Sequence, residues 1–191
     1  MPLPKANKKN TYTDYLTWPK EERWEIIDGT SYMQAAPSWQ HQVVSRELLT
    51  QINSCLRGKT CQVFAAPFDV RIPEKEEKDE DTTFVVQPDL VVVCDRDGLK
   101  GTGYYGTPAL IIEITSPSTA KKDKVLKFNK YEKSGVKEYW IVEPDGKIVS
   151  VFTLQENQRY GRPETYTEED QVKISVLPDV IIDLGPVFTA I

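Results

Sequence analysis

The stretch PALIIEITSPST (Pro108–Thr119) is a run of branched apolar residues with one carboxylate, Glu113, near its centre. Continuous runs of Val, Ile and Leu bounded by Pro or Gly are typical of strands that are buried on both faces. A lone carboxylate in such a strand costs free energy unless it is paired or binds a cation. The role of Glu113 is therefore the first question that this sequence raises.

Helical patterns precede and follow this strand. PSWQHQVVSRELLTQINSCLRG (Pro37–Gly58) has apolar residues at four-residue spacing, with Ser38 as a cap and Gly58 as a stop. TAKKDKVLKFNKYEKSG (Thr119–Gly135) predicts a second helix, capped by Ser118 or Thr119 and ended by Gly135. VKEYWIVEP then predicts a strand. A helix that crosses between two adjacent strands favours an α/β class (α+β, mixed) with helices packed on a mixed sheet.

The remaining segments predict further β-structure. RWEIIDGTSYMQ (Arg23–Gln34) predicts a hairpin that turns at Asp28-Gly29. CQVFAAPFDVRI predicts a strand interrupted or bent near Pro67, and FVVQPDLVVVC predicts the next strand. GLKGTGYYGT predicts a connector. Residues 1–13 are expected to form a mobile tail, and residues 14–191 a single domain.

Composition excludes several classes of protein. The chain has 191 residues, 39% hydrophobic and 28% charged, which suits one globular domain. No apolar run reaches the length of a membrane helix, and the polar N-terminus has no apolar core of a secretory signal, so a cytoplasmic protein is expected. The net charge of -5 gives no global basic field, so nucleic-acid binding would need a local basic patch.

Cysteine and histidine limit the chemistry further. Cys55, Cys61 and Cys94 are odd in number and lack CxxC spacing, which predicts reduced, mostly buried thiols and no zinc site. His41 is the one histidine, so sites built from several histidines are excluded. The sequence contains neither GxGxxG nor GxxxxGK[ST], so nucleotide-binding loops are not supported.

Three features converge on one kind of chemistry. Asp89 begins the apolar strand QPDLVVV, Glu113 lies inside the next strand, and Asp123, Lys127 and Tyr131 share one face of the following helix. If the two strands are neighbours, the two carboxylates lie side by side and repel each other. A divalent cation such as Mg²⁺ relieves this repulsion, and a nearby lysine then stabilises charge on a phosphate.

Structural explanations remain open at this point. Asp89 could cap the entrance of its strand, and Glu113 could pair with a core lysine or arginine. Asp123 and Lys127 could form an ordinary helical ion pair four residues apart. His41 could be a satisfied structural residue.

A string of motifs then identifies a relationship. Pro88-Asp89, IIEITSPS (Ile111–Ser118) and GVKEYWIVEP (Gly135–Pro144) resemble the Uma-two family of restriction endonucleases, in the PD-(D/E)xK nuclease superfamily. WEIIDG (Trp24–Gly29) and AAPFDVRIP (Ala65–Pro73) resemble the same family. The resemblance implies a restriction-endonuclease-like fold with a mixed four-stranded central sheet flanked by helices. It also implies Mg²⁺-dependent (or Mn²⁺-dependent) hydrolysis of DNA phosphodiester bonds.

By this resemblance Asp89 and Glu113 are metal ligands, and the backbone carbonyl of Ile114 is a third. The superfamily pattern expects a lysine two residues after the second acid, where this chain has Thr115. The family suggests that the lysine has moved to the following helix, where Lys127 matches best.

Lys122 and Lys124 are the rival positions for this lysine. Glu25 and His41 resemble residues that recur near the family's site, and together with Asp123 they are accessory candidates. The catalytic set expected is therefore Asp89, Glu113 and Lys127.

A second function competes with the nuclease. The missing strand lysine and the acidic net charge favour a catalytically inactive nuclease fold that serves as a binding or assembly module. For an active enzyme we expect a homodimer, because double-strand cutters need two active centres.

Overall fold

The computed structural model describes residues 8–117, 119–189 and 191, which form two compact units. Unit 1 contains residues 8–36, 66–88 and 96–107, and unit 2 contains residues 37–65, 89–95 and 108–191. Each unit is assembled from three separate stretches of the chain. The single domain expected over residues 14–191 stays a prediction.

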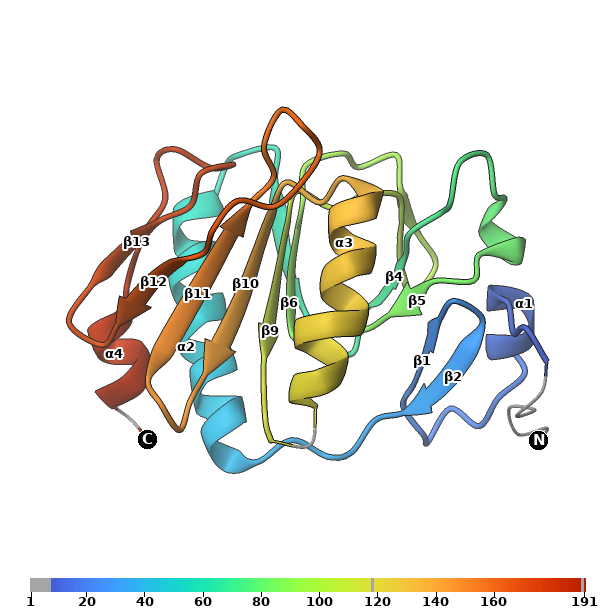
Figure 1. Ribbon diagram of the computed structural model, residues 1–191, viewed down its shortest axis with the longest axis horizontal. Coiled ribbons are helices and arrows are strands. Elements are labelled where there is room, and N and C mark those ends of the chain that lie inside the picture. The colour runs from blue at the N-terminus through green and yellow to red at the C-terminus, as the bar shows by residue number, and fades with distance from the viewer. Residues whose placement is uncertain (1–7, 118, 190) are drawn as a thin grey trace. The chain divides into compact units, whose positions relative to one another are not determined.

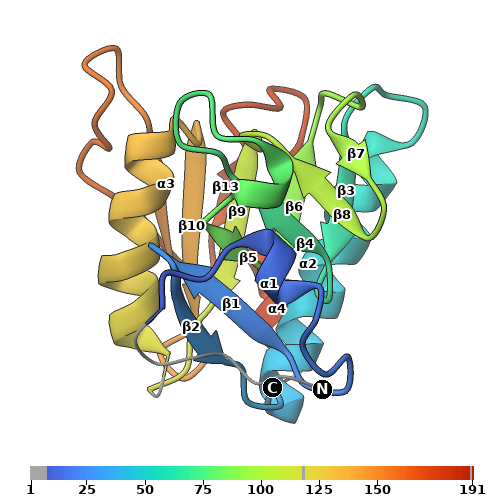
Figure 2. The same cartoon turned by 90° about the vertical axis from the view of Figure 1, so that its right-hand side faces the viewer.

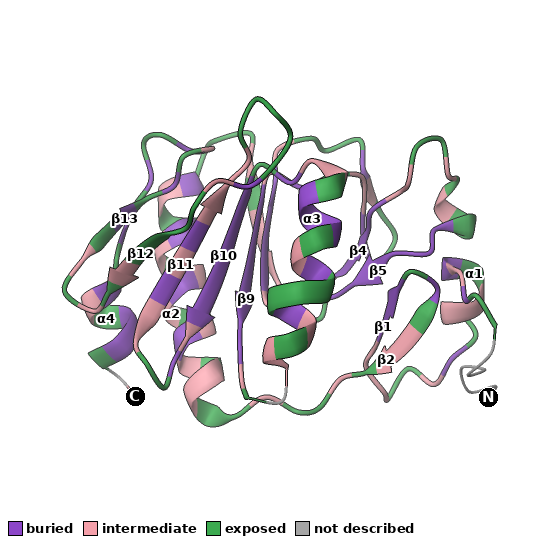
Figure 3. Cartoon of the chain, viewed as in Figure 1, coloured by how far each residue is buried: buried purple, intermediate pink, exposed green. Residues whose placement is uncertain are grey.

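Unit 2 is built on a six-stranded mixed sheet with the order β12-β11-β10-β9-β6-β3. β9 and β10 are parallel, and the other neighbouring pairs are antiparallel. The strands are β3 (Gln62–Ala65), β6 (Leu90–Val93), β9 (Leu110–Ile114), β10 (Glu138–Glu143), β11 (Ile148–Thr153) and β12 (Glu164–Thr167). The mixed sheet is confirmed, with six strands where the family resemblance implied four. β9 is buried over its whole length, as its sequence predicted (Figure 3).

The even-numbered residues of β9 face the main apolar core. Leu110, Ile112 and Ile114 pack there with the buried side of α2 (Trp39–Leu56) and with α4 (Leu184–Thr189). The Oγ atom of Ser38 accepts a hydrogen bond of 3.2 Å from the backbone N–H of His41, so the predicted cap of α2 is confirmed. A two-stranded sheet, β13 (Gln171–Lys173) with β14 (Ile181–Asp183), adds to this unit.

The odd-numbered residues of β9 face the opposite side of the sheet, because side chains alternate along a strand. A π-helix, η2 (Lys122–Lys127), runs directly into α3 (Phe128–Ser134) on this side. Figure 1 shows α2 and α3 covering opposite faces of the unit 2 sheet. Gly135 ends α3 with φ 81°, as predicted, whereas Ser118 lies outside the described residues. Glu113 is therefore aimed at the helix that carries Lys127.

Unit 1 contains a second six-stranded sheet with the order β2-β1-β5-β4-β8-β7. Its strands are β1 (Trp24–Ile27), β2 (Thr30–Met33), β4 (Asp69–Arg71), β5 (Val85–Val86), β7 (Leu99–Lys100) and β8 (Gly103–Tyr105). The predicted hairpin is confirmed, with positive φ at both Asp28 and Gly29. Figure 2 shows this hairpin with α1 (Tyr12–Tyr15) beside it, and a short 3-10 turn, η1 (Asp79–Asp81), completes the unit.

Two strand predictions need correction. The segment Phe84–Cys94 is two strands, because Pro88 has no N–H to continue a ladder and the chain passes from the unit 1 sheet to the unit 2 sheet there. The segment Gly98–Thr107 is a hairpin of β7 and β8 and was wrongly predicted as a connector. Its strands have two and three residues, which is too short for a periodic signal. The interruption predicted near Pro67 is confirmed, since β3 and β4 flank it.

The cysteine prediction was wrong for two of the three residues. Cys61 and Cys94 form a disulfide, and Cys55 is free. The antiparallel register pairs Gln62 with Val93, so the next positions outward on β3 and β6 are the two cysteines. The two cysteines are 33 residues apart in the sequence, and only the pairing of β3 with β6 brings them together. The sequence alone therefore could not predict this disulfide.

The N-terminal segment is only partly described. Of the tail expected over residues 1–13, residues 1–7 lie outside the described residues. Asn10 and Tyr12, in contrast, are buried, with exposed fractions of 2% and 9%. Asn10 donates its backbone N–H to the carbonyl of Gly29, so this part of the segment is bound to the β1–β2 turn.

Candidate active site

Glu113 lies at the centre of a buried polar cluster in unit 2. It exposes only 4% of its surface. Its Oε1 atom accepts one hydrogen bond of 2.9 Å from Lys127 Nζ and another of 2.9 Å from the hydroxyl of Tyr131. These two donors offset the cost of burying the carboxylate on β9. The contact with Lys127 fits both a structural ion pair and the lysine position that the family resemblance implied.

Among the candidate lysines, Lys127 is buried beside Glu113. It exposes 1% of its surface and lies between two carboxylates, with Asp123 Oδ1 3.6 Å from its Nζ atom. Lys124 instead lies at the surface and pairs with Glu143 at 2.7 Å, and Lys122 is half-buried. Both Asp123 and Lys127 belong to η2, and π-helical turns are frequent at functional sites.

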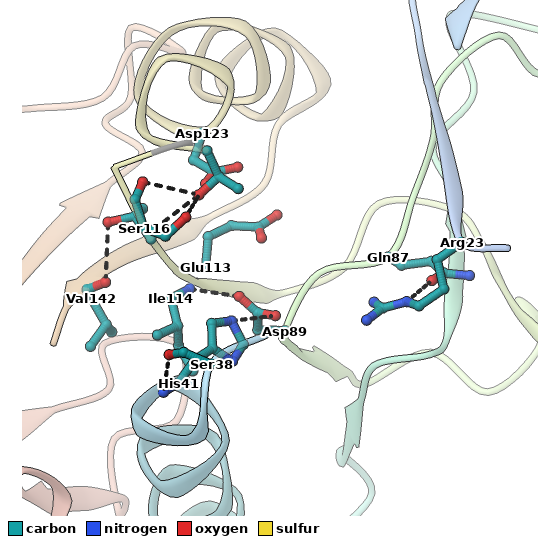
Figure 4. A network of polar contacts seen from close by, with 12 residues as sticks. Arg23, Ser38, His41, Gln87, Asp89, Glu113, Ile114, Ser116, Asp123 and Val142 are labelled. Atoms are coloured by element: carbon teal, nitrogen blue, oxygen red, sulfur yellow. Dashed lines mark hydrogen bonds and ion pairs between the residues drawn. The ribbon is translucent and has the colours of Figure 1, made fainter. Parts of the chain in front are cut away.

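Asp89 is held from two sides at the start of β6. Its Oδ1 atom is 3.1 Å from Nε2 of His41, in the first turn of α2. Its Oδ2 atom accepts a hydrogen bond of 2.7 Å from the backbone N–H of Ile114. Figure 4 shows Asp89 between His41 and Ile114, with Glu113 close by. The structure thus brings both predicted acids and His41 into one cluster of unit 2.

The backbone of Ile114 supports its predicted role as a ligand. The N–H and C=O groups of one strand residue leave the strand on the same edge. Since the N–H of Ile114 points to Asp89, its carbonyl points to the same edge of β9. The Asp89 carboxylate and the Ile114 carbonyl therefore lie at the same edge of β9.

One ring nitrogen of His41 forms no hydrogen bond with the described residues. Within the described part of the chain, its Nδ1 atom is buried and has no hydrogen-bond partner. Buried polar atoms are normally paired, so an unpaired nitrogen beside a carboxylate pair marks a place for an outside group. The sequence indicated His41 only through the family resemblance, because helical spacing alone gives a histidine no role.

The other candidates are placed as follows. Thr115 is buried and contributes only a hydroxyl, which donates a hydrogen bond of 3.4 Å to the carbonyl of Val142. Asp123 accepts a hydrogen bond of 3.2 Å at its backbone carbonyl from the hydroxyl of Tyr139. Burial, with the nearby Glu113 and Asp123 carboxylates, raises the pKa of Tyr139 well above its ordinary value, so this hydroxyl remains a donor.

Glu25 belongs to unit 1, where its Oε1 atom accepts a hydrogen bond of 3.2 Å from the backbone N–H of Gln87. Its accessory role stays a prediction.

The donor set fits a hard divalent cation. Among the described residues, no group of three or more His, Cys, Asp or Glu side chains is arranged to hold a metal ion. Magnesium needs no such group, because one or two carboxylates with water and substrate phosphate complete its shell. Asp89, Glu113 and the Ile114 carbonyl are all oxygen donors of the kind that magnesium prefers.

Comparison with known proteins agrees with this arrangement of motifs. A family model described as "Uma2: Putative restriction endonuclease" matches residues 12–185. The chain belongs to the Uma2 family. Membership confirms the family that the motifs around Asp89 and Glu113 indicated.

Two individual proteins are similar to this Uma2 chain. A crystal structure of a putative nuclease belonging to DUF820, from Anabaena variabilis, has a TM-score of 0.74 at 18% identity, covering 94% of this chain and 97% of that chain. At this identity the likeness shows the fold. The "Uncharacterized protein slr1290" of Synechocystis sp. is 30% identical over 132 residues, which span 68% of this chain and 64% of that protein. In the described ranges, no helix has both the length and the apolar character to cross a membrane.

Proposed function

We propose that this Uma2 protein is a Mg²⁺-dependent endonuclease that hydrolyses DNA phosphodiester bonds. The observation that carries the proposal is the buried Nζ atom of Lys127, 2.9 Å from Glu113. It supplies from a helix the cation that the superfamily pattern expects at the position of Thr115. Asp89, Glu113 and the carbonyl of Ile114 would hold Mg²⁺, with Mn²⁺ as a substitute.

A bound Mg²⁺ would supply charge neutralisation at the phosphate and lower the pKa of a water molecule. The protein's own groups do the rest. Lys127 stabilises the negative charge that grows on the phosphate oxygens, and Tyr131 fixes the Glu113 oxygen that Lys127 contacts. His41 and the Ile114 N–H hold the Asp89 carboxylate in one orientation.

Metal binding is the first test. Mn²⁺ is titrated by calorimetry into metal-free wild type and into Glu113→Gln. Glu143→Gln is the matched control, because Glu143 is a carboxylate of the same unit that pairs with exposed Lys124. We expect saturable binding in wild type and control, and none in Glu113→Gln. Wild type that binds no metal, both alone and with a DNA oligonucleotide, contradicts the proposal.

Cleavage is the second test. Wild type should cut supercoiled plasmid only when Mg²⁺ or Mn²⁺ is added. Lys127→Met should lower the cleavage rate by about 10²-fold or more, since it removes a charge aimed at the transition state. Lys124→Met, on the same helical segment, should cut at the wild-type rate. Equal rates for Lys127→Met and wild type would remove the catalytic role of Lys127.

One observation favours a second candidate function, an inactive nuclease fold that binds or assembles. Protein donors among the described residues already contact Asp89 and Glu113: His41, the Ile114 N–H, Lys127 and Tyr131. A thermal shift with Mg²⁺ separates the two functions. A metal site stabilises the folded state by mass action, and the shift should vanish in Asp89→Asn. DNA binding without a metal-dependent shift or cleavage supports the inactive module.

We also propose that the active form is a homodimer, since cutting both strands requires two active centres. Sedimentation of the protein with duplex DNA should give a complex that contains two chains. A complex with one chain, in a preparation that makes double-strand breaks, contradicts this.

A further inference from the structure

Unit 1 contains a cavity of about 390 Å³ that has no part in the site of unit 2. Its lining comes from four separate stretches: the segment from α1 to β1, the start of β4, the residue before Pro88, and the β7–β8 turn. This volume lies within the range of roughly 300–1,000 Å³ that is usual for small-molecule sites. The cavity is large enough for one nucleobase with its sugar.

One wall of the cavity is aromatic. Tyr15, Trp18 and Trp24 line it, with ring centroids 5.5 Å apart between Tyr15 and Trp18 and 5.7 Å apart between Trp18 and Trp24. Trp18 is buried, with 5% of its surface exposed, and the two others are half-buried. Aromatic faces of this kind stack with planar ligands, and every nucleobase has such a face.

A polar network also lines the cavity. Asp69 Oδ1 accepts hydrogen bonds from the Tyr15 hydroxyl at 2.8 Å and from Gln87 Nε2 at 2.9 Å. Asp69 Oδ2 accepts one hydrogen bond of 3.0 Å from Thr102. Burial, together with the Asp69 carboxylate, raises the pKa of Tyr15 well above its ordinary value, so Tyr15 remains a donor. The network keeps Asp69 Oδ2 and Gln87 Oε1 in fixed positions, each with one further lone pair as an acceptor.

Two donors complete the cavity. The Nε atom of Arg23 donates to Gln87 Oε1 at 2.9 Å, as Figure 4 shows, while its two terminal nitrogens have no partner among the described residues. The indole N–H of Trp18, another lining residue, likewise has no acceptor in the described part of the chain. A planar ligand with both donors and acceptors on its edge matches these groups.

We propose that this cavity binds an unpaired nucleobase of the substrate, with its 5′ phosphate on Arg23. The base stacks on the aromatic wall, and its edge pairs with Asp69, Gln87 and the Trp18 N–H. Lys20 and Arg23 line the cavity beside the carboxylates of Glu22 and Asp69, and the two cations give a phosphate a partner that the aromatic rings alone would not supply. That the base belongs to DNA rests on the proposed function.

The test uses a short single-stranded oligonucleotide with one fluorescent 2-aminopurine base, titrated into the full chain in EDTA. EDTA removes metal ions, so a failure of the metal site leaves this binding unchanged. Stacking on the tryptophans should quench the probe. Arg23→Gln should weaken binding about tenfold, and Trp24→Leu should remove the quenching. Arg46→Gln, which removes an exposed arginine of unit 2, should bind like wild type.

Competition experiments show which chemical group the cavity binds. Competition by deoxynucleoside monophosphates, weaker competition by nucleosides and none by inorganic phosphate support the proposal. Equal quenching in wild type and Trp24→Leu, with circular dichroism showing both folded, overturns it. So does competition by choline in place of nucleotides. Metal-dependent cleavage without quenching would retain the proposed function and reject the nucleobase site.

Discussion

At the scale of single residues, the Glu113–Lys127 pair dominates the energetics of the candidate site. Both side chains are buried, and removing one takes away the opposite charge that lies 2.9 Å from the other. We expect Lys127→Met to lower the free energy of unfolding by about 3–5 kcal/mol. Lys124→Met, which breaks an exposed pair, should cost about 0–1 kcal/mol. Urea unfolding of the two variants at neutral pH measures both values.

The double variant Glu113→Gln with Lys127→Met completes this prediction. It removes both charges, so it should be more stable than Lys127→Met alone. If the two single effects simply add, the pair is not coupled, and the buried ion pair seen in the structure contributes no specific interaction. The same cycle on plasmid cleavage separates loss of folding from loss of chemistry.

Residue patterns predicted the unit 2 site better than the unit 1 cavity. Asp89 and Glu113 belong to apolar strands, and Lys127 is four residues from both Asp123 and Tyr131, so periodicity alone gave their faces. Arg23, Asp69 and Gln87 come from three distant stretches that carry no shared motif. Their convergence depends on how the unit 1 strands pair, which no local pattern encodes.

At the scale of elements, the disulfide joins the outer ends of β3 and β6. Cross-linking residues 33 apart restricts the unfolded chain, so Cys61→Ala should lower the free energy of unfolding by about 2–4 kcal/mol. Urea unfolding with and without a reductant measures this. Wild type and Cys55→Ala should both lose stability on reduction, whereas Cys61→Ala should be insensitive to reductant. A wild type that is indifferent to reductant contradicts a role of the cross-link in stability.

Elements with strong local signals were predictable, and those defined by tertiary pairing were not. α2 has a cap, four-residue spacing and a terminal glycine, and the helix, Trp39–Leu56, lies within the predicted segment Pro37–Gly58. β7 and β8 form a hairpin because Leu99 and Lys100 pair with Tyr104 and Gly103, not because of their own composition. The break at Pro88 was visible as a proline, but the change of sheet that it permits was not.

At the scale of the whole molecule, the chain passes between the two units several times, and Asp89 lies directly after one of these passages. The period of a sequence pattern indicates the local structure of neighbouring residues. It cannot show that β5 and β6, which are adjacent in the sequence, belong to different sheets. The sequence therefore indicated a central sheet with extra hairpins, but not that these hairpins belong to a second six-stranded sheet. The Uma2 motifs can still be recognised in the sequence, because each lies within one element or one turn and does not depend on the passages between units.

Tyrosine ionisation gives a prediction that spans both units. Of nine tyrosines, Tyr15, Tyr105, Tyr139 and Tyr160 have pKa values raised mainly by burial. A hydrogen bond to Glu164 raises the pKa of Tyr166 from 10.0 to about 12. We expect tyrosinate absorbance of the folded protein to rise later than that of the urea-unfolded chain, which should titrate near pH 10. Nine tyrosines that ionise together at pH 10 in folded protein would contradict this.

The sign of the linked stability change follows from the raised pKa. Above pH 10 the unfolded chain loses the Tyr166 proton while the folded chain keeps it, so the contribution of this group is complete below pH 10 and is lost between pH 10 and about 12. The stability difference between wild type and Tyr166→Phe should therefore be constant below pH 10 and change in favour of the variant above it. Urea unfolding across this range measures the difference.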